Sequence, residues 1–245
     1  MTTPTSSHDT EISPRSKGRL FALFYLMTIV TGVFAQGFIS ERLIDHNDAA
    51  RTVANIAANG TLYRFGFTLF MVEMVSQIVM TLLFYDLLKP VNRSVARTAA
   101  VIALTGCGIK VLARLFYYAP LLLTPSVALS GFGEAQLQAL SIALLRLNDQ
   151  CAAIALVFFG FESLLNGWLV VKSGFLPRWL GAVSMLGGLG WMTFLWPPLG
   201  SRLFMVIALV ALVGSALTIG WLLVKGIDEQ RWLEKARVSA SSIWR

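Results

Sequence analysis

Four ionisable side chains lie within long apolar stretches of the sequence, where charge is unusual. They are Glu73, Lys110, Arg114 and Glu162. A charged side chain at the centre of a bilayer costs at least roughly 2.5–3.5 kcal/mol on insertion scales, so four unpaired charges would neutralise or fail to insert. Two cations and two carboxylates therefore predict mutual ion pairing inside a helix bundle, with Lys110 and Glu162 as one expected pair.

Amide side chains accompany the two carboxylates. Gln77 follows Glu73, and Asn166 follows Glu162, each four residues later and so on the same helix face. At about 1.5 Å of rise per residue, the charged groups lie within about 10 Å of one another in depth. The candidate ligand-binding or structural ion-pair cluster has these members: Glu73, Gln77, Lys110, Arg114, Glu162 and Asn166.

Two interpretations of this cluster stay open. A silent ion-pair cluster would fix which helix faces which, and a polar cavity would bind a polar ligand or protons. We favour a cavity in the outer half of the bundle. There Arg114 would face the anionic part of a ligand, and Glu73 and Glu162 would orient its guanidinium group.

Other site chemistries lack the residues that they need. His8 and His46 both lie outside the apolar stretches, and Cys107 and Cys151 are far apart, so the sequence has no zinc motif and no histidine-based triad. We expect neither a metal nor a cofactor. The net charge of +7 comes from Lys and Arg in short segments between apolar runs, which does not predict nucleic-acid binding.

The segments that must position the cluster are hydrophobic and long. Apolar residues make up 56% of the sequence and charged residues 13%, about half of the roughly 25% that is usual in soluble domains, so a soluble globule is excluded. Six stretches approach or exceed the ~20 residues that span a bilayer as a helix. They predict an all-α polytopic membrane protein with six transmembrane helices at approximately 20–40, 62–88, 98–123, 150–171, 179–197 and 203–224.

Amphipathic segments and polar tails surround these stretches. Asn47 and Asp48 predict the start of a short outer helix that ends near Gly60, and leucines at helical spacing from Gly131 to Leu147 predict a second one. We expect residues 1–18 to form a disordered cytoplasmic tail, 19–225 the transmembrane domain and 226–245 a basic cytoplasmic tail.

Small residues share one face of the fifth stretch. Gly181, Ser184 and Gly188 form a stripe at helical spacing. Such a stripe lets two membrane helices approach closely. We therefore expect this face to pack against a neighbouring helix.

Positive charge is distributed unevenly between alternate loops. The two tails and the turns at 89–97 and 172–178 hold 13 Lys and Arg, and the intervening loops hold 5. Because Lys and Arg accumulate in cytoplasmic loops, this asymmetry predicts that both termini lie in the cytoplasm. The expected location is the bacterial cytoplasmic (inner) membrane, crossed several times.

Four segments resemble a known family. They are Gly18–Leu26, Asp48-Ala-Ala with Asn55-Ile56, Leu87–Arg93 with its Lys-Pro-Val-Asn-Arg turn, and Lys172–Gly181 with its Phe-Leu-Pro-Arg-Trp-Leu-Gly sequence. They resemble the mainly bacterial integral membrane proteins catalogued as domain of unknown function 4386. The resemblance implies a multi-pass architecture and no agreed activity. Many relatives carry His where this sequence has Glu162.

Three functions stay open at this point. The first is a module that binds or moves a polar or amphiphilic ligand, such as a lipid, through a charged midplane pocket. The second is a membrane enzyme acting on a lipid or isoprenoid, with Glu73 or Glu162 as acid or base, although no second catalytic cluster supports it. The third is a structural or regulatory subunit that binds another membrane protein or a second copy of itself.

The charge asymmetry predicts the outcome of reporter fusions. Fusions after Lys89 and Lys172 are expected to report a cytoplasmic location. Fusions near Gly60 and Gly131 are expected to report a location on the outer side of the membrane. Paired reporters that are active on opposite sides of the membrane measure this. One reversed loop would contradict the predicted topology.

Overall fold

The structure is a computed structural model that describes residues 12–123 and 131–241, and these residues are all-helical. The elements in chain order are α1 (Pro14–Val33), the π-helix η1 (Phe34–Ser40), α2 (Glu41–Leu43), α3 (Ala49–Ala58), α4 (Gly60–Leu88), α5 (Arg93–Leu122), α6 (Glu134–Ser173), α7 (Arg178–Met192), the 3₁₀ turn η2 (Thr193–Leu195), α8 (Pro197–Val224) and α9 (Glu229–Ser241).

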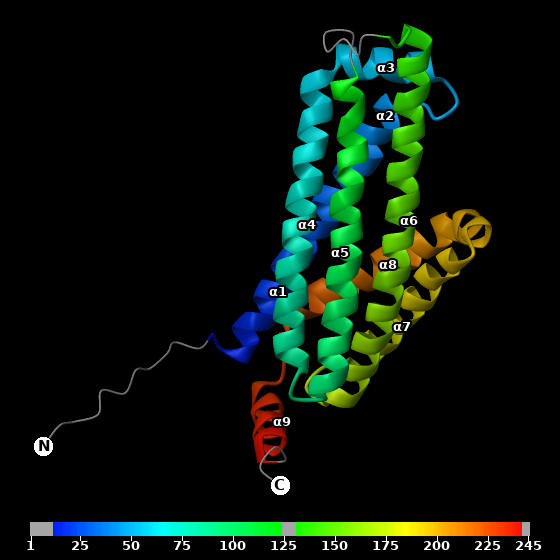
Figure 1. Cartoon of the computed structure of the whole chain (residues 1–245). Helices are drawn as coiled ribbons and strands as arrows, with labels where there is room; N and C mark the ends of the chain where they lie inside the picture. The colour runs from blue at the N-terminus through cyan, green and yellow to red at the C-terminus, as the bar shows by residue number, and fades with distance from the viewer. Residues whose placement is uncertain (1–11, 124–130, 242–245) are drawn as a thin grey trace, which may run out of the picture.

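The long helices form a closed ring (Figure 1). Each of α1, α4, α5, α6, α7 and α8 packs against the next in that order, and α8 returns to pack against α1. The short helix α3 lies across one end and contacts α4, α5 and α6. A ring leaves its inward-facing side chains to line a shared interior, which is where the site is found.

Five helical segments of the described residues are long and apolar enough to cross a membrane. They are Pro14–Leu43, Gly60–Leu88, Arg93–Leu122, Glu134–Ser173 and Pro197–Val224. The multi-pass helical prediction is thereby confirmed, but with five candidate spans in place of six.

The fifth predicted span, 179–197, is the exception. Helix α7 ends at Met192 after 15 residues, which is about 22 Å of rise against the roughly 30 Å of a hydrocarbon core. The cause is the following Pro197–Pro198 pair. A residue before proline is forced out of the helical region, and Trp196 is extended at φ −117° and ψ 91°.

Of the two predicted outer helices, one forms as a separate helix and the other is part of a longer one. The first is α3, whose N-cap Asp48 accepts a hydrogen bond from the backbone N–H of Arg51 at 2.9 Å. The second is not a separate helix, because Gly131–Leu147 leads directly into the 40-residue α6. No Gly or Pro interrupts residues 134–159, so nothing in this stretch ends the helix.

The tails are more helical than expected. Ser13 caps α1, and Pro14 starts it, so helix precedes the predicted boundary at residue 19. At the other terminus α9 docks on the bundle, where the Trp232 indole Nε1–H donates to the carbonyl oxygen of Leu87 at 2.9 Å. The tail is thus anchored to the end of α4. Residues 1–11 and 242–245 of the predicted tails lie outside the described residues.

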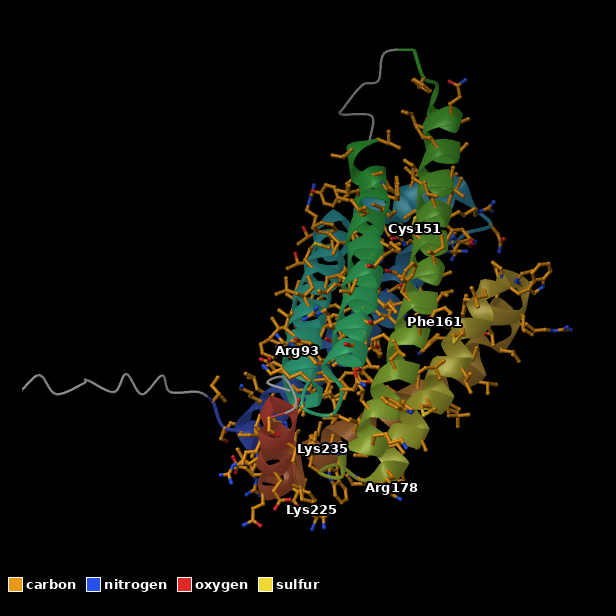
Figure 2. All side chains as sticks on the ribbon, turned by 60° about the horizontal axis from the view of Figure 1, so that its bottom comes forward. Arg93, Cys151, Phe161, Arg178, Lys225 and Lys235 are labelled. Atoms are coloured by element: carbon orange, nitrogen blue, oxygen red, sulfur yellow. The ribbon has the colours of Figure 1, made fainter. Side chains whose placement is uncertain are left out.

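The basic residues gather at one end of the bundle. Figure 2 shows Arg93, Arg178, Lys225 and Lys235 toward this end and Cys151 toward the other. The start of α1, the α4–α5 turn, the α6–α7 turn and α9 all lie here (Figure 1). The fold therefore brings together the segments in which the sequence concentrates Lys and Arg.

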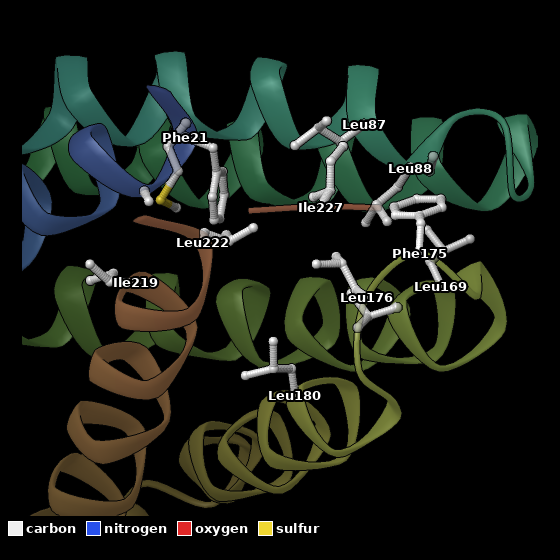
Figure 3. Packing of buried hydrophobic residues seen from close by; sticks show 14 residues of the cluster. Phe21, Leu87, Leu88, Leu169, Phe175, Leu176, Leu180, Ile219, Leu222 and Ile227 are labelled. Carbon is white, nitrogen blue, oxygen red and sulfur yellow. The ribbon is translucent and has the colours of Figure 1, made fainter. Parts of the chain in front are cut away.

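A hydrophobic cluster packs this basic end (Figure 3). Leu87 and Leu88 of α4 are fully buried and meet Phe175 from the α6–α7 turn and Leu222 of α8. Phe21 of α1 belongs to the same cluster. A second cluster packs the opposite end around η1, α3, α4, α5 and α6. Two packed ends enclose the middle of the ring.

Helices α6 and α7 approach through reciprocal glycine pairs. A Cβ added to Gly188 would lie 2.7 Å from the carbonyl oxygen of Gly160, and one on Gly160 would lie 2.8 Å from that of Gly188. Gly167 and Gly181 form the same arrangement, at 2.6 and 2.5 Å. Ser184 Oγ donates to the carbonyl oxygen of Ser163 at 3.2 Å. The expected small-residue stripe of α7 therefore faces α6.

Two neighbouring glycines of α7 give a matched test of this contact. Gly188→Ala is expected to destabilise the protein by about 1–3 kcal/mol, because the new methyl group overlaps backbone. Gly187→Ala is expected to be neutral, because its Cβ would meet nothing closer than 3.9 Å. Unfolding of both variants in mixed micelles measures the difference, and equal stabilities would show that the helices are not in this contact.

Candidate functional site

A cavity of about 610 Å³ occupies the middle of the ring. All six long helices contribute to its lining. Apolar side chains of α7 and α8 form much of one wall, including Val183, Leu209 and Leu212. The polar and ionisable lining residues are Tyr25, Thr28, Gln36, Glu41, Glu73, Gln77, Thr81, Lys110, Glu162, Ser163, Asn166, Ser184, Ser215 and Thr218. The space is therefore amphiphilic.

An ion pair joins α4 and α5 at the cavity. Lys110 Nζ donates to Glu73 Oε1 at 2.5 Å, and their side chains are 17% and 8% exposed. The second oxygen, Glu73 Oε2, is buried with no hydrogen-bond partner among the described residues. Gly32 of α1 makes room for this carboxylate, since a Cβ there would lie 2.9 Å from Glu73 Oε1. The site thus holds one ion pair and one open acceptor.

Glu162 of α6 lines the same cavity with different partners. The Asn166 side-chain amide donates to Glu162 Oε1, and Ser163 Oγ donates to Oε2 at 3.4 Å. In the described part of the chain no ion pair reaches Glu162, so the expected pairing with Lys110 is absent. The Lys110 ammonium group contacts Glu73 instead.

Gln77 lies where the sequence predicted it. It lines the cavity one turn from Glu73, and its backbone carbonyl accepts a hydrogen bond from Thr81 Oγ1 at 2.8 Å. The structure therefore brings five of the six predicted site residues to one cavity: Glu73, Gln77, Lys110, Glu162 and Asn166.

Arg114 is the sixth, and it is not among the residues that line the cavity. Its Nη1 donates to Asn148 Oδ1 at 3.2 Å, and its Cζ lies 3.6 Å from the centre of the Phe70 ring. Phe70 and Tyr117 belong to the second hydrophobic cluster, which fills the bundle at this level. The expectation that Arg114 faces an anion in an outer cavity therefore does not match the structure.

The structure also adds polar contacts that the sequence analysis missed. Tyr25 and Ser215 share a hydrogen bond at 2.6 Å, which joins α1 to α8 across the cavity. Tyr63 Oη donates to the carbonyl oxygen of Tyr117 at 2.5 Å, with the two rings stacked at 4.4 Å. Tyrosines and serines at helical spacing do not reveal such contacts, because each pair joins distant parts of the chain.

A polar chain leads from Arg114 toward the end covered by α3. Asn148 donates to Asp149 Oδ1 at 3.0 Å, and Asp149 Oδ2 lies 3.4 Å from His46 Nε2. A pocket of about 110 Å³ lies here and shares Gln36 and Glu41 with the large cavity. The adjacent polar residues Asn148 and Asp149, next to the apolar stretch that begins at Cys151, were the available signal in the sequence.

The ion pair predicts non-additive stabilities. Replacing Glu73 or Lys110 alone with Met strands one buried charge and is expected to cost about 3–5 kcal/mol, and replacing both is expected to recover much of that loss. The Lys110→Met and Glu162→Met losses are expected to add, since those two groups form no ion pair. Unfolding free energies of the single and double variants measure both cycles. Strong coupling in the second cycle would contradict this geometry.

Comparison with known proteins matches this architecture to a family. A protein of Archaeoglobus fulgidus, described as an uncharacterized protein, is 28% identical over 155 residues, which cover 60% of this chain and 93% of that protein. No solved structure matches the chain significantly. The family model of the domain of unknown function DUF4386 matches residues 20–226, which include the long helices of the ring except the first six residues of α1. The chain therefore belongs to the DUF4386 family.

Proposed function

We propose that this protein is a membrane module that binds an amphiphilic molecule inside its helix ring. The observation that carries the proposal is the amphiphilic cavity, where the ionisable groups of α4, α5 and α6 face an apolar wall from α7 and α8. A head group would lie near Glu73, Lys110 and Glu162, and an apolar tail would lie along Leu209 and Leu212. Ligand pockets of 300–1,000 Å³ typically combine an apolar lining with a few polar groups in this way.

Access from the lipid phase follows from the exposure of the lining. Four residues that line the cavity are also exposed on the outer surface. They are Val33 at the end of α1 (50% exposed) and, on α8, Phe204 (45%), Met205 (77%) and Leu209 (62%). Helix α8 packs mainly against α7, α1 and η2, so its half near Phe204 has neighbours on few sides. A lipid-like molecule would enter here without crossing a packed interface.

We infer a single orientation for this module. Both termini would lie in the cytoplasm, which requires an even number of crossings, so the short helix α7 would carry the chain back across the inner membrane between the long segments α6 and α8. The clustering of the basic turns and α9 at one end supports this orientation, because Lys and Arg favour the cytoplasmic side.

A ligand site explains features that a purely structural cluster does not need. A silent ion-pair cluster is expected to satisfy its charges internally, yet Glu73 Oε2 has no partner among the described residues. We therefore favour the binding module over the structural and enzymatic alternatives.

Photolabelling in native membranes, with and without a side chain that fills the cavity, tests the proposal. The probe is a long-chain alcohol with an aryl diazirine at its chain end, and mass spectrometry locates the label after illumination. Phe159 lines the cavity, whereas Ile154 of the same helix faces outward with 51% exposure. We expect label at both positions in the unmodified protein.

Ala208→Trp places a large ring against the cavity, and Ala216→Trp places the same ring on the outer surface of α8. The first is expected to lower labelling near Phe159 about tenfold, equivalent to about 1.4 kcal/mol of binding free energy. The second, and labelling near Ile154, are expected to stay unchanged. Equal labelling near Phe159 in both variants would reject the cavity as a binding site.

A further inference from the structure

The charges that line the cavity do not balance. Among its described lining residues are the carboxylates of Glu41, Glu73 and Glu162 and one ammonium group, that of Lys110. Arg114, which would have reduced the difference, lies outside the lining. The cavity therefore presents an excess of acidic groups.

The one cation is already engaged. Lys110 Nζ contacts Glu73 Oε1 at 2.5 Å, so an anionic head group would compete with a buried carboxylate for it. Breaking that pair would strand Glu73 in a low-dielectric interior, which is unfavourable. The arrangement therefore disfavours anionic ligands.

The cavity carboxylates, in contrast, are incompletely neutralised. Glu73 is 6% exposed, and its Oε2 has no hydrogen-bond partner in the described residues. Within residues 12–123 and 131–241, Glu162 receives hydrogen bonds from Asn166 and Ser163 of its own helix and no ion pair. A buried carboxylate is stabilised by a cation that also donates hydrogen bonds. Glu73 has one such partner, the Lys110 ammonium group, and Glu162 has none among the described residues.

Aromatic rings and the neighbouring pocket also favour a positively charged ligand. Tyr25, Phe84, Phe159 and Trp191 line the cavity, and aromatic faces attract organic cations. The smaller pocket that shares Glu41 with the cavity is also lined by Asp149. Acidic groups thus continue from the cavity toward the end covered by α3.

We propose that the preferred ligand class is a cationic amphiphile, with an alkylammonium or similar organic cation at the Glu162 carboxylate, beside the Glu73–Lys110 ion pair, and its tail along α8. This inference rests on the proposed function, because it assigns a head-group charge to the molecule that the cavity binds. The organic cation neutralises the Glu162 carboxylate, and the apolar side chains of α8 contact the tail.

A head-group series tests the charge preference. Three probes share the same chain and terminal aryl diazirine and differ only in an alcohol, ammonium or sulfate head. Labelling near Phe159 is divided by labelling near Ile154, which corrects for how much of each probe enters the membrane. We expect this ratio to be about tenfold higher for the ammonium than for the sulfate probe, with the alcohol between them. Equal ratios, or a higher ratio for sulfate, would overturn the inference.

Variants of Glu162 identify the group that sets the preference. Glu162→Gln is expected to lower ammonium labelling relative to alcohol labelling in the same variant, and Glu162→Asp is expected to retain the preference because it keeps the carboxylate. Glu134→Gln, at the exposed start of the same helix, is the matched control and is expected to change neither. An unchanged ammonium preference in Glu162→Gln would overturn the assignment.

The two proposals fail in different ways. If the alcohol probe labels near Phe159 and Ala208→Trp blocks it, but the three head groups give equal ratios, the binding module stands and the cationic preference is rejected. If none of the three probes labels near Phe159, both proposals are rejected.

Discussion

The cost of charge in a membrane interior is the constraint on which this structure depends, and it is met in three ways. Glu73 and Lys110 neutralise each other across α4 and α5. Arg114 lies over the Phe70 ring and donates to Asn148, within a packed aromatic cluster. Glu162 receives hydrogen bonds from its own helix alone. Only the first arrangement cancels charge, so the carboxylates of α4 and α6 leave the cavity acidic.

The cavity exists because packing is concentrated elsewhere. One hydrophobic cluster closes the basic end, and another fills the opposite end around η1 and α3. The glycine pairs between α6 and α7 draw these two helices together, so α7 stays on the perimeter of the ring. Side chains in the middle of the bundle therefore meet open volume. A ring with two packed ends can keep such a space without losing its core contacts.

Helix length decides where the cavity meets the lipid phase. Helix α6 has 40 residues and α7 only 15, so the α7–α8 hairpin ends well short of the far end of α6 (Figure 1). This leaves Phe204 and Met205 of α8 exposed while they also line the cavity. The Pro197–Pro198 pair, which prevents α7 from continuing, is thus the local cause of the lateral opening.

The sequence by itself determined the helical membrane architecture, the family and five residues of the cavity lining out of six predicted, because apolar length and rare charges are local signals. Periodicity placed Glu73 beside Gln77 and Glu162 beside Asn166 on shared faces. It did not decide which cation meets which carboxylate, since that choice depends on how neighbouring helices rotate and slide. It also did not show that Arg114, only one turn beyond Lys110, leaves the cavity. Only the tertiary structure decided both, because the Lys110 side chain meets Glu73 at the cavity, whereas Arg114 lies over the Phe70 ring and donates to Asn148 beside the second hydrophobic cluster.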